Sequence, residues 1–579
     1  MSPDNRNLLA AMVLSFAILI GWQAFFIEPE IEAERARLAA EALLEDPVSS
    51  GAMESAAASA SAGASGAASS VSEEIVEAAR ITIDAPRLSG SLTTAGARID
   101  DLLMLDYQNE LGGVDDAVRL LNPVDSELPY FLEMGWVSAD VNHPAPSSKT
   151  VWQTNDSVLS PETPVTLYWN NGNGLTFERR IEIDDDYLFS ITDSVNSTLS
   201  APVVLNPYGF VRRHGTPELT GIYILHEGPL AVFDEKLNEE DYSDLKKAGA
   251  EGIQFAPEVS GGWIGITDKY WLTALIPNQN ETVSYSMRSL GGGQDRYQTD
   301  FLGAPITIEP GEQISWSANL FAGAKKLSVL DDYAETYNIA NFDLAIDFGW
   351  FYFLTKPFFY ALNFLYGMFG NFGVAIVIFT AFMRLAMYPL ASRSYRSMGK
   401  MRQLAPKLQE MRERHGDDRQ KLNQEMMALY KQEKVNPAAG CLPILLQIPI
   451  FFALYKVLYV SIEMRHAPFF GWVQDLSDVD PTSILNLFGL LPYSVDMFPQ
   501  FISIGIWPIL MGISMFVQMR LNPTPPDPIQ AKIFQYMPIF FTFLLAGFPA
   551  GLVIYWTVNN LLSVLQQWWI TRSMQPKTS

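Results

Sequence analysis

The chain has 579 residues, of which 48% are hydrophobic and 12% aromatic, and its formal net charge is −25. It is too apolar for an ordinary soluble protein and too charged for a purely membrane-embedded one, so a mixed architecture is expected. The single cysteine, Cys441, excludes an intrachain disulfide, and the five histidines have no metal-ligand spacing, so we expect neither a metal site nor a cofactor.

The charge is distributed unevenly along the chain. Residues 1–345 contain 20 of the 39 Lys and Arg residues and 51 of the 64 Asp and Glu residues, which gives a net charge of −31. Residues 346–579 contain the other 19 basic and 13 acidic residues, a net charge of +6. This asymmetry predicts an acidic, water-facing body followed by a basic-biased membrane part.

The N-terminal region predicts a membrane anchor and a tether. Leu8 to Ile27 is an uncharged run of 20 residues, long enough to cross a bilayer and longer than the apolar core of a cleavable signal. We therefore expect residues 1–27 to form a signal-anchor span, with Arg6 on its cytoplasmic side and four glutamates beyond it. Residues 28–80, which include an Ala/Ser/Gly-rich stretch, are expected to be a flexible linker.

Residues 81–340 alternate apolar and polar positions with period two, punctuated by Gly, Pro, Asn and Asp. This pattern predicts many antiparallel strands and hence a large extracytoplasmic β-sandwich domain. Residues 341–370 are rich in aromatics and poor in charges, which predicts an amphipathic helix in the outer membrane interface.

Arg384 lies inside an otherwise apolar stretch from Asn371 to Ala391 that is long enough to span a bilayer. As one continuous helix it would place Arg384 ~20 Å from the Asn371 end and ~10 Å from the other end. A charged residue at that depth either faces water, a partner or a polar cavity, or extends along the helix to the nearer interface and only orients it. Position alone leaves both interpretations open.

The basic segment that follows, residues 392–434, predicts a cytoplasmic helical hairpin. It contains 11 Lys and Arg residues against 6 Asp and Glu residues, which favours the cytoplasmic side. Apolar residues recur with helical spacing on one face, and we expect most of them to pack the hairpin together, with an adaptable binding surface as the minor alternative. They are Met398, Met401, Leu404, Leu408 and Met411.

Four further apolar segments complete the chain: 442–462, 501–519, 533–548 and 552–570. With the anchor and the Arg384 helix they make a polytopic α-helical membrane protein of six spans, with both termini cytoplasmic. Residues 371–579 would then form a core of five spans. We also expect an interfacial helix over 467–476 and a short cytoplasmic turn over 520–532.

The core spans carry many uncharged polar residues but no deeply placed Asp or Glu, so Arg384 has no evident carboxylate partner. An unpaired intramembrane arginine implies a wet cavity that attracts an anionic or polar visitor. We expect about half of the uncharged polar residues to form hydrogen bonds between helices. They are Thr380, Gln447, Gln518, Thr542, Thr557, Asn559, Asn560, Ser563, Gln566 and Gln567.

The chain has no nucleotide-binding loop. A cavity that opens toward the cytoplasm, beside the basic hairpin, would suit an apolar polypeptide segment with a short polar flank. Transfer of that segment into lipid would supply the favourable free energy for insertion.

Three strings resemble the YidC family of membrane-protein insertases, within the wider Oxa-type insertases: GNFGVAIVIFTAFMRLAMYPL from residue 370, the stretch from MRQLAPKLQEM at 401 to IPIFFALY at 455, and FPAGLVIYWTVNNLLSVLQQ from 548. The resemblance covers residues 350–575 by motif and the whole chain by layout. It implies an inner-membrane insertase and chaperone of the Gram-negative type, not an enzyme. It also implies a periplasmic sandwich that is similar to sugar-mutarotase domains, without sugar chemistry, and that contacts the Sec translocon.

The resemblance also implies site residues and partners. By resemblance the substrate groove would contain Arg384, Thr380, Phe451, Tyr555 and Trp556. We expect Gln447 and Asn559, two of the polar residues of the core spans, to line it as well. Contact with the ribosome would fall on Arg396, Lys400, Arg402, Lys407, Arg412 and Arg414, and on the 520–532 turn. The other partners would be nascent membrane proteins, the Sec translocon with its accessory subunits, and the lipid bilayer.

The family often has two tyrosines where this chain has Tyr555 and Trp556, so which of them faces the groove stays open. Lys456 stands where a neutral residue is expected. We expect its side chain to extend toward the outer interface, which would keep its charge in water. Two other functions remain as alternatives: a small-anion transporter that uses Arg384, and a membrane-tethered glycan-binding or glycan-modifying protein.

Overall fold

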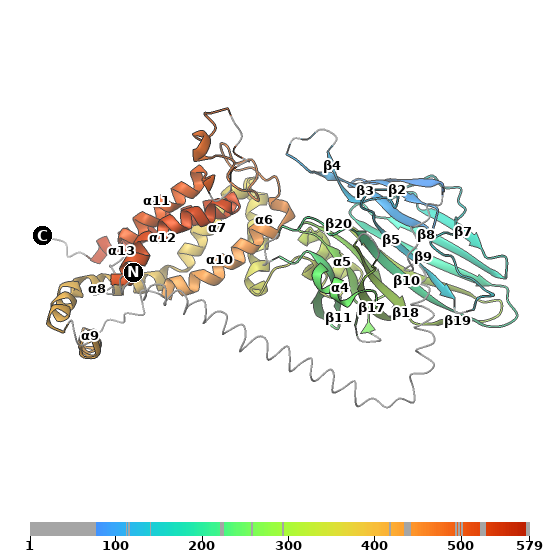
Figure 1. Cartoon of the computed structure of the whole chain (residues 1–579), viewed down its shortest axis with the longest axis horizontal. Coiled ribbons are helices and arrows are strands. Elements are labelled where there is room, and N and C mark those ends of the chain that lie inside the picture. Colours follow the sequence, from blue (N-terminus) through green and yellow to red (C-terminus); the bar gives the residue numbers. More distant parts are fainter. Residues whose placement is uncertain are drawn as a thin grey trace.

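The computed structural model describes residues 77–574, with gaps at 112, 114–115, 139, 221–224, 256–258, 292–294, 416–418, 434–441, 493–494, 496–497, 499–501 and 522–527. The predicted first span and nearly all of the predicted linker lie outside these residues. The strands form one lobe together with α4 (Tyr242–Ala248) and α5 (Leu327–Thr336), and the other helices form the second lobe (Figure 1). α6 (Tyr352–Phe369) and α10 (Leu442–Val460) reach the strand lobe where the two meet.

The described strands form two large sheets, and the prediction of a β-sandwich is confirmed. Pairing is antiparallel except between β1 and β6. In sheet order, the twelve-stranded sheet contains β13 (Ile253–Gln254), β17 (Thr282–Ser289), β18 (Arg296–Gly303), β10 (Val203–His214), β5 (Tyr130–Ser138), β3 (Arg98–Gln108), β2 (Leu88–Thr93), β1 (Arg80–Asp84) and β6 (Val158–Leu159), with β14 (Val259–Ser260) beside β17, β19 (Ile306–Ile308) beside β10 and β4 (Ala117–Leu121) beside β3.

The eight-stranded sheet packs against it. Its strands are, in order, β12 (Lys236–Glu239), β11 (Gly228–Phe233), β15 (Trp263–Thr267), β16 (Trp271–Pro277), β20 (Gln313–Ala324), β9 (Leu188–Ser197), β8 (Leu175–Ile183) and β7 (Val165–Asn170). β8 illustrates why the sequence folds this way: its alternate residues, from Leu175 to Ile183, are all buried, while those between them are exposed or half-buried.

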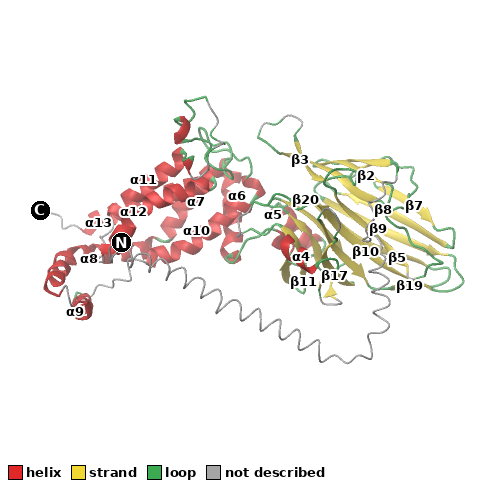
Figure 2. Ribbon diagram, viewed as in Figure 1, coloured by secondary structure: helices red, strands yellow, loops and turns green. Residues whose placement is uncertain are grey.

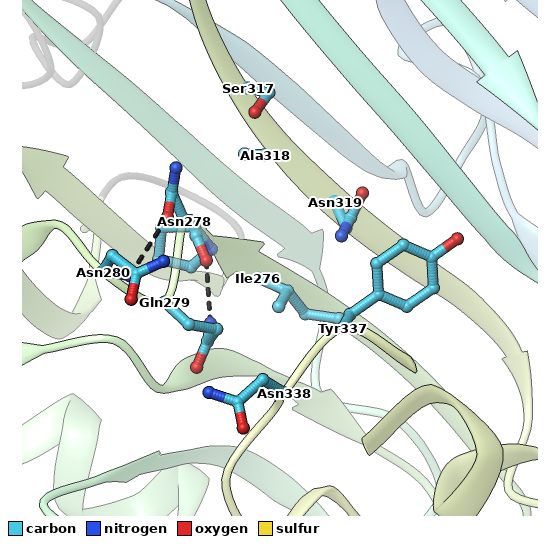
Figure 3. A pocket seen from close by; sticks show the side chains of 10 residues that line it. Ile276, Asn278, Gln279, Asn280, Ser317, Ala318, Asn319, Tyr337 and Asn338 are labelled. Atoms are coloured by element: carbon cyan, nitrogen blue, oxygen red, sulfur yellow. Dashed lines mark hydrogen bonds between the residues drawn. The ribbon is translucent and has the colours of Figure 1, made fainter. Parts of the chain in front are cut away.

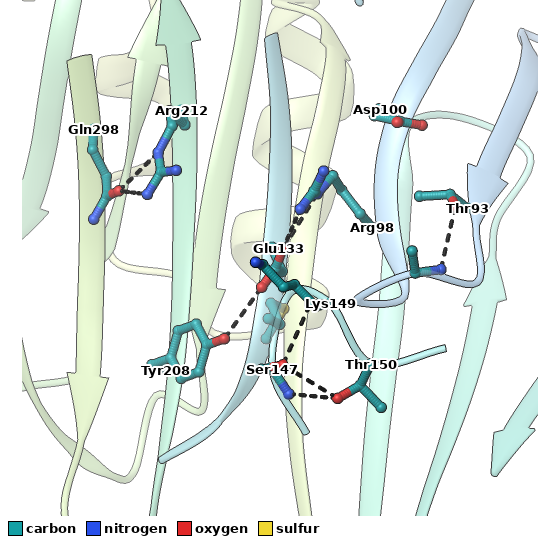
Figure 4. Close-up of polar contacts among 12 residues, drawn as sticks. Thr93, Arg98, Asp100, Glu133, Ser147, Lys149, Thr150, Tyr208, Arg212 and Gln298 are labelled. Atoms are coloured by element: carbon teal, nitrogen blue, oxygen red, sulfur yellow. Dashed lines mark hydrogen bonds and ion pairs between the residues drawn. The ribbon is translucent and has the colours of Figure 1, made fainter. Parts of the chain in front are cut away.

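Charged residues inside the sandwich are held by hydrogen bonds (Figure 4). The Arg98 guanidinium lies 3.0 Å from a carboxylate oxygen of Glu133, and the Tyr208 hydroxyl donates to the other oxygen at 3.2 Å. Nearby, the buried Arg212 donates to the side-chain carbonyl of Gln298 at 2.6 Å. Buried polar groups are tolerated when they are paired in this way.

Because Lys325 is buried, we expect the stability of the sandwich to depend on pH. Its ammonium is buried and donates to the Thr267 hydroxyl at 2.8 Å, and burial lowers the pKa of Lys325 to about 8. The unfolded chain, with a lysine pKa of ~10.4, binds more protons than the folded chain between these two pKa values. The free energy of unfolding contributed by this group should therefore rise with pH across that window.

We expect Lys325→Met to be more stable than the wild type at pH 7–8 by on the order of 2–3 kcal/mol, and this advantage to shrink toward pH 10. The measurement is the urea concentration at which the sandwich becomes protease-sensitive, compared between the two proteins at each pH. A difference that stays constant with pH would show that Lys325 does not titrate in this range.

The helical lobe contains the elements that position the candidate site (Figure 2). In chain order the described helices after β20 are α5 (Leu327–Thr336), the short η2 (Phe342–Ala345), α6, α7 (Phe372–Ala386), α8 (Tyr388–His415), α9 (Arg419–Gln432), α10, the short η4 (Ile462–Met464) and η5 (Ile484–Asn486), α11 (Ile506–Leu521), α12 (Pro528–Leu544), the short η7 (Leu545–Gly547) and α13 (Ala550–Met574). α13 packs against α7 and α11, and α6 packs against α7 and α10.

The Arg384 helix is shorter than predicted. Instead of continuing to Ala391, α7 ends at Ala386 and the chain bends by 65° into α8. Pro389 explains the break, because proline removes a backbone donor and disfavours helical geometry at the preceding residue. Arg384 therefore lies in the last turn of α7, where the helix dipole favours a positive charge, and not ~10 Å from the helix end.

Among the helices that the structure describes, none taken singly has both the length and the apolarity of a membrane span, and only the bent pair of α7 with residues 388–401 meets both conditions together. Three shorter apolar helical stretches cover residues 447–460, 506–521 and 531–547. The expectation of an interfacial helix over 467–476 is wrong: this segment consists of turns and extended chain, because Pro468 and Gly471, which has φ +72°, interrupt helical geometry.

Candidate functional site between the helices

The helical lobe is apolar on its outer surface as well as in its core, and it also buries uncharged polar side chains. Large apolar side chains on its outer surface are exposed, among them Ile513 and Phe516 of α11, Ile539 and Phe540 of α12, and Leu565 of α13. The polar side chains buried in its interior are Thr380, Ser514, Thr557, Asn559, Asn560, Ser563 and Gln567. An apolar exterior of this extent matches a lipid environment and not water.

Arg384 meets a neutral partner. Its Nε donates to the Oδ1 of Asn559 on α13 at 2.7 Å, and its side chain is half-buried. Within the described part of the chain, no acidic side chain forms an ion pair with Arg384. The other nitrogens of the guanidinium remain donors for a further acceptor.

A second cross-helix bond lies beside the first. Gln447 of α10 donates from Nε2 to the Tyr555 hydroxyl at 2.6 Å. Tyr555 and Asn559 are four residues apart on α13 and thus share one face. The bond holds Tyr555 in place, with only 3% of its side chain exposed.

Aromatic rings continue the same surface. Phe451, four residues after Gln447 on α10, meets Trp556 edge to face with ring centroids 4.6 Å apart. Trp556 also contacts Phe541 of α12 at 5.5 Å. Because Trp556 is half-exposed and Tyr555 is buried, Trp556 is the more accessible of the two aromatics.

Thr380 is not brought into this arrangement. Its side chain is 1% exposed, and its hydroxyl donates to the Ile376 carbonyl of its own helix at 2.6 Å. The other six predicted groove residues lie together on α7, α10 and α13. The structure adds a pair that the prediction did not include: the Asn560 amide donates to the Ser514 hydroxyl of α11 at 3.0 Å.

Eight of the ten uncharged polar residues, all except Gln518 and Gln566, divide into two kinds. Four of them, Gln447, Asn559, Asn560 and Gln567, bond to another helix. Four others, Thr380, Thr542, Thr557 and Ser563, bond to a carbonyl four residues earlier in their own helix. Because these hydroxyls already donate to their own helix, they cannot donate a hydrogen bond to a bound segment.

α8 and α9 pack on each other through apolar residues, including Leu404 and Tyr430, with Met401, Leu408 and Met426 against them. Four predicted contact residues, Arg396, Lys400, Lys407 and Arg414, have exposed side chains on α8, and Lys407 pairs with Glu433 at 3.0 Å. Arg402 and Arg412 lie on the same helix, but their side chains are outside the described part of the structure, as is the 522–527 part of the predicted 520–532 turn.

The extension of Lys456 toward the outer interface stays a prediction, but the structure shows what its ammonium contacts. Lys456 is 9% exposed, and its Nζ lies 2.7 Å from Asp347 in the segment that connects the sandwich to α6. The sequence indicated a special role for Lys456, because it is the only charged residue in an apolar helix. Its partner Asp347 lies 109 residues earlier and could not be inferred from spacing.

A pocket in the sandwich is separate from these residues (Figure 3). Its volume is about 160 Å³, and neutral side chains of the β16–β17 turn, β20 and the segment after α5 line it, including Asn278, Asn319 and Tyr337. Figure 3 shows the side chains that line it, among them the amides Asn278, Gln279, Asn280, Asn319 and Asn338.

Comparison with known proteins identifies both lobes. Residues 80–361 match the family described as YidC periplasmic domain, and residues 364–577 match the family described as 60Kd inner membrane protein. The membrane protein insertase YidC of Granulibacter bethesdensis is 49% identical over 577 residues, covering 98% of each chain. That of Rhizobium meliloti is 46% identical over 569 residues, covering 97% of this chain and 95% of that one.

A crystal structure of an active YidC insertase with its first transmembrane domain resolved is similar at a TM-score of 0.34 and 16% identity, covering 85% of this chain and 92% of that one. The two family matches define a class of inner-membrane protein that carries a periplasmic domain, which in this chain is the β-sandwich. Within that class, the chain belongs to the YidC family of membrane protein insertases.

Proposed function

We propose that this protein inserts nascent membrane proteins by receiving an apolar segment on the surface formed by Arg384, Gln447, Phe451, Trp556 and Asn559, which we call the groove. The observation that carries this proposal is that Arg384 bonds to the neutral Asn559 and leaves donors available. A guanidinium that has only neutral partners can bind the carboxylate or carbonyl groups of a polar flank.

The free energy for insertion comes from burying the apolar residues of the client in lipid. On insertion scales each Leu, Ile, Phe or Val at the centre of a span contributes about −0.3 to −0.6 kcal/mol, so ~20 such residues give about −6 to −12 kcal/mol. One acidic or basic residue costs ~2.5–3.5 kcal/mol. A polar surface inside the membrane lowers the barrier for a short flank, and the aromatic rings offer an apolar contact for the segment itself.

We propose six spans with both termini in the cytoplasm. Lengths support this arrangement: the 19 residues of α10 extend ~28 Å, the 25 residues of α13 ~38 Å, and the 16 and 17 residues of α11 and α12 ~24–26 Å. The hydrocarbon core is ~30 Å thick, and the bilayer can thin around shorter helices at modest cost. The aromatic α6 would lie at the periplasmic interface.

The basic α8–α9 hairpin would face the cytoplasm, where its exposed residues Arg396, Lys400 and Arg414 can contact the ribosome electrostatically. We propose the Sec translocon as a second partner, with which the protein would act as a chaperone for larger clients. The protein can be depleted, and the inner-membrane proteins that then fail to insert can be identified. The result would separate clients that need both this protein and the Sec translocon from clients that need this protein alone.

The groove is tested by site-specific photo-crosslinking. A photoreactive residue at Trp556 should form an adduct with a nascent single-span client, because Trp556 is half-exposed beside Phe451. Tyr555 should give at least ~5-fold fewer adducts, since buried side chains have little access to a partner. Leu561, an exposed residue of the same helix, serves as the control for lipid-facing positions. Equal adducts from Leu561 and Trp556 would count against a defined groove.

A further inference from the structure

Lys456 is a charged residue buried near the end of α10, in a helix that is otherwise apolar apart from Gln447. Its Nζ lies 2.7 Å from Oδ2 of Asp347, and both side chains are largely buried. A buried charge is tolerated only when it is paired, and the removal of one partner leaves the other uncompensated. The pair is therefore a strong geometric constraint on α10.

Asp347 also organises its own surroundings. Its Oδ2 accepts the backbone N–H of His226, just before β11 in the sandwich, at 3.1 Å. Its Oδ1 accepts the backbone N–H of Gly349 at 3.0 Å. One carboxylate thus joins the sandwich, the connecting segment before α6, and α10.

Gly349 makes room for the lysine. It adopts φ +68°, a conformation that favours glycine, and a Cβ at this position would lie 2.8 Å from the Cε of Lys456. The aliphatic part of Lys456 therefore packs directly on the backbone of the connecting segment. Two residues further on, the Phe351 ring stacks on Phe452 of α10 with centroids 6.5 Å apart.

We propose that Asp347 and Lys456, which pack against Gly349, are positioning residues. Their ion pair fixes the position of α10 along its axis and therefore the position of its groove residues. Gln447 and Phe451 precede Lys456 by nine and five residues, ~13 and ~8 Å along the same helix. A helix transmits an axial shift at one end to the other, so release of the pair would move both residues relative to Tyr555 and Trp556 on α13. This inference rests on the proposed function for the role of Phe451, but the anchoring of α10 does not.

The first measurement is hydrogen exchange of the full-length protein in lipid nanodiscs. Lys456→Met and Gly349→Ala should each accelerate exchange over residues 447–460 by roughly tenfold or more, because a local buried contact is lost. Lys456→Arg keeps the charge and should exchange much more slowly than Lys456→Met. The matched control is Lys356→Met, which breaks the pair of Lys356 with Asp343 (2.6 Å) that anchors α6 at the same junction.

The second measurement is photo-crosslinking from Phe451 to a nascent client, normalised to that from Trp556. Adducts from Phe451 should fall several-fold in Lys456→Met and Gly349→Ala and remain in Lys356→Met. Unchanged exchange over 447–460 in both variants, or an equal increase in Lys356→Met, would overturn the inference, as would faster exchange with unchanged adducts. Absence of adducts in the unmodified protein would instead contradict the proposed groove, and exchange alone would then decide whether the pair anchors α10.

Discussion

Arg384→Ala is expected to lower the insertion of single-span clients with a short acidic tail by roughly tenfold or more. A hydrogen bond to a charged group contributes ~1.5–3 kcal/mol, and each 1.4 kcal/mol is a factor of about ten. Arg384→Lys should retain much of the activity, because it keeps the positive charge while losing the planar donor set. The measurement is protease protection of the translocated tail in proteoliposomes, for clients with acidic and with neutral tails.

Arg393→Ala is the matched control, since Arg393 is exposed on α8, beyond the bend, nine residues further along. It should insert clients at the rate of the unmodified protein. Clients with neutral tails should be less sensitive to Arg384→Ala than acidic ones. Insertion by Arg384→Lys as poor as by Arg384→Ala would contradict a role for charge and favour a role for guanidinium shape or packing.

Arg179→Met is expected to destabilise the sandwich by ~3–5 kcal/mol, because it leaves the buried carboxylate of Asp193 without a counter-ion. Arg179 is 1% exposed and contacts both oxygens of Asp193 at 2.7 Å. It also donates to the Met134 carbonyl of β5 at 2.7 Å, while the Trp136 indole donates to Asp193 at 2.8 Å. The network therefore ties the two sheets together.

The neighbouring residue gives a sharp comparison. Arg180 points to the opposite face of β8, where its side chain is 49% exposed and pairs with Glu182. Arg180→Met should change the stability by no more than ~0.5 kcal/mol, as for other exposed ion pairs. The urea concentration at which the sandwich becomes protease-sensitive measures both variants. Equal effects at the two positions would show that burial of Arg179 does not determine its contribution.

Local patterns in the sequence were sufficient for the strands. In β8 the alternation of Leu175, Phe177, Ile181 and Ile183 predicts a half-buried strand, and these residues are buried. The same alternation places Arg179 on the inward face, a signal for a buried ion pair that the sequence analysis did not use. Its partner could be read only from the structure, because pairing between β8 and β9 sets which acid lies opposite.

The helical lobe was harder to predict in detail. Pro389 was a visible reason to end the Arg384 helix early, but the apolar run around it favoured a longer span. The contact between Arg384 and Asn559 joins residues 175 positions apart, and it depends on how α7 packs against α13. Likewise, the burial of Thr380 follows from helix packing and from its bond to its own backbone, neither of which a motif contains.

Thiol labelling at position 384 tests most directly whether this site is hydrated and needs a positive charge. In a Cys441→Ser background, Arg384→Cys should react with a water-soluble aminoethyl thiosulfonate from the cytoplasmic side without detergent, and the attached ammonium should restore insertion. A neutral reagent of similar size should react but restore nothing. Failure of both reagents to react, or equal recovery with the neutral one, would contradict the account.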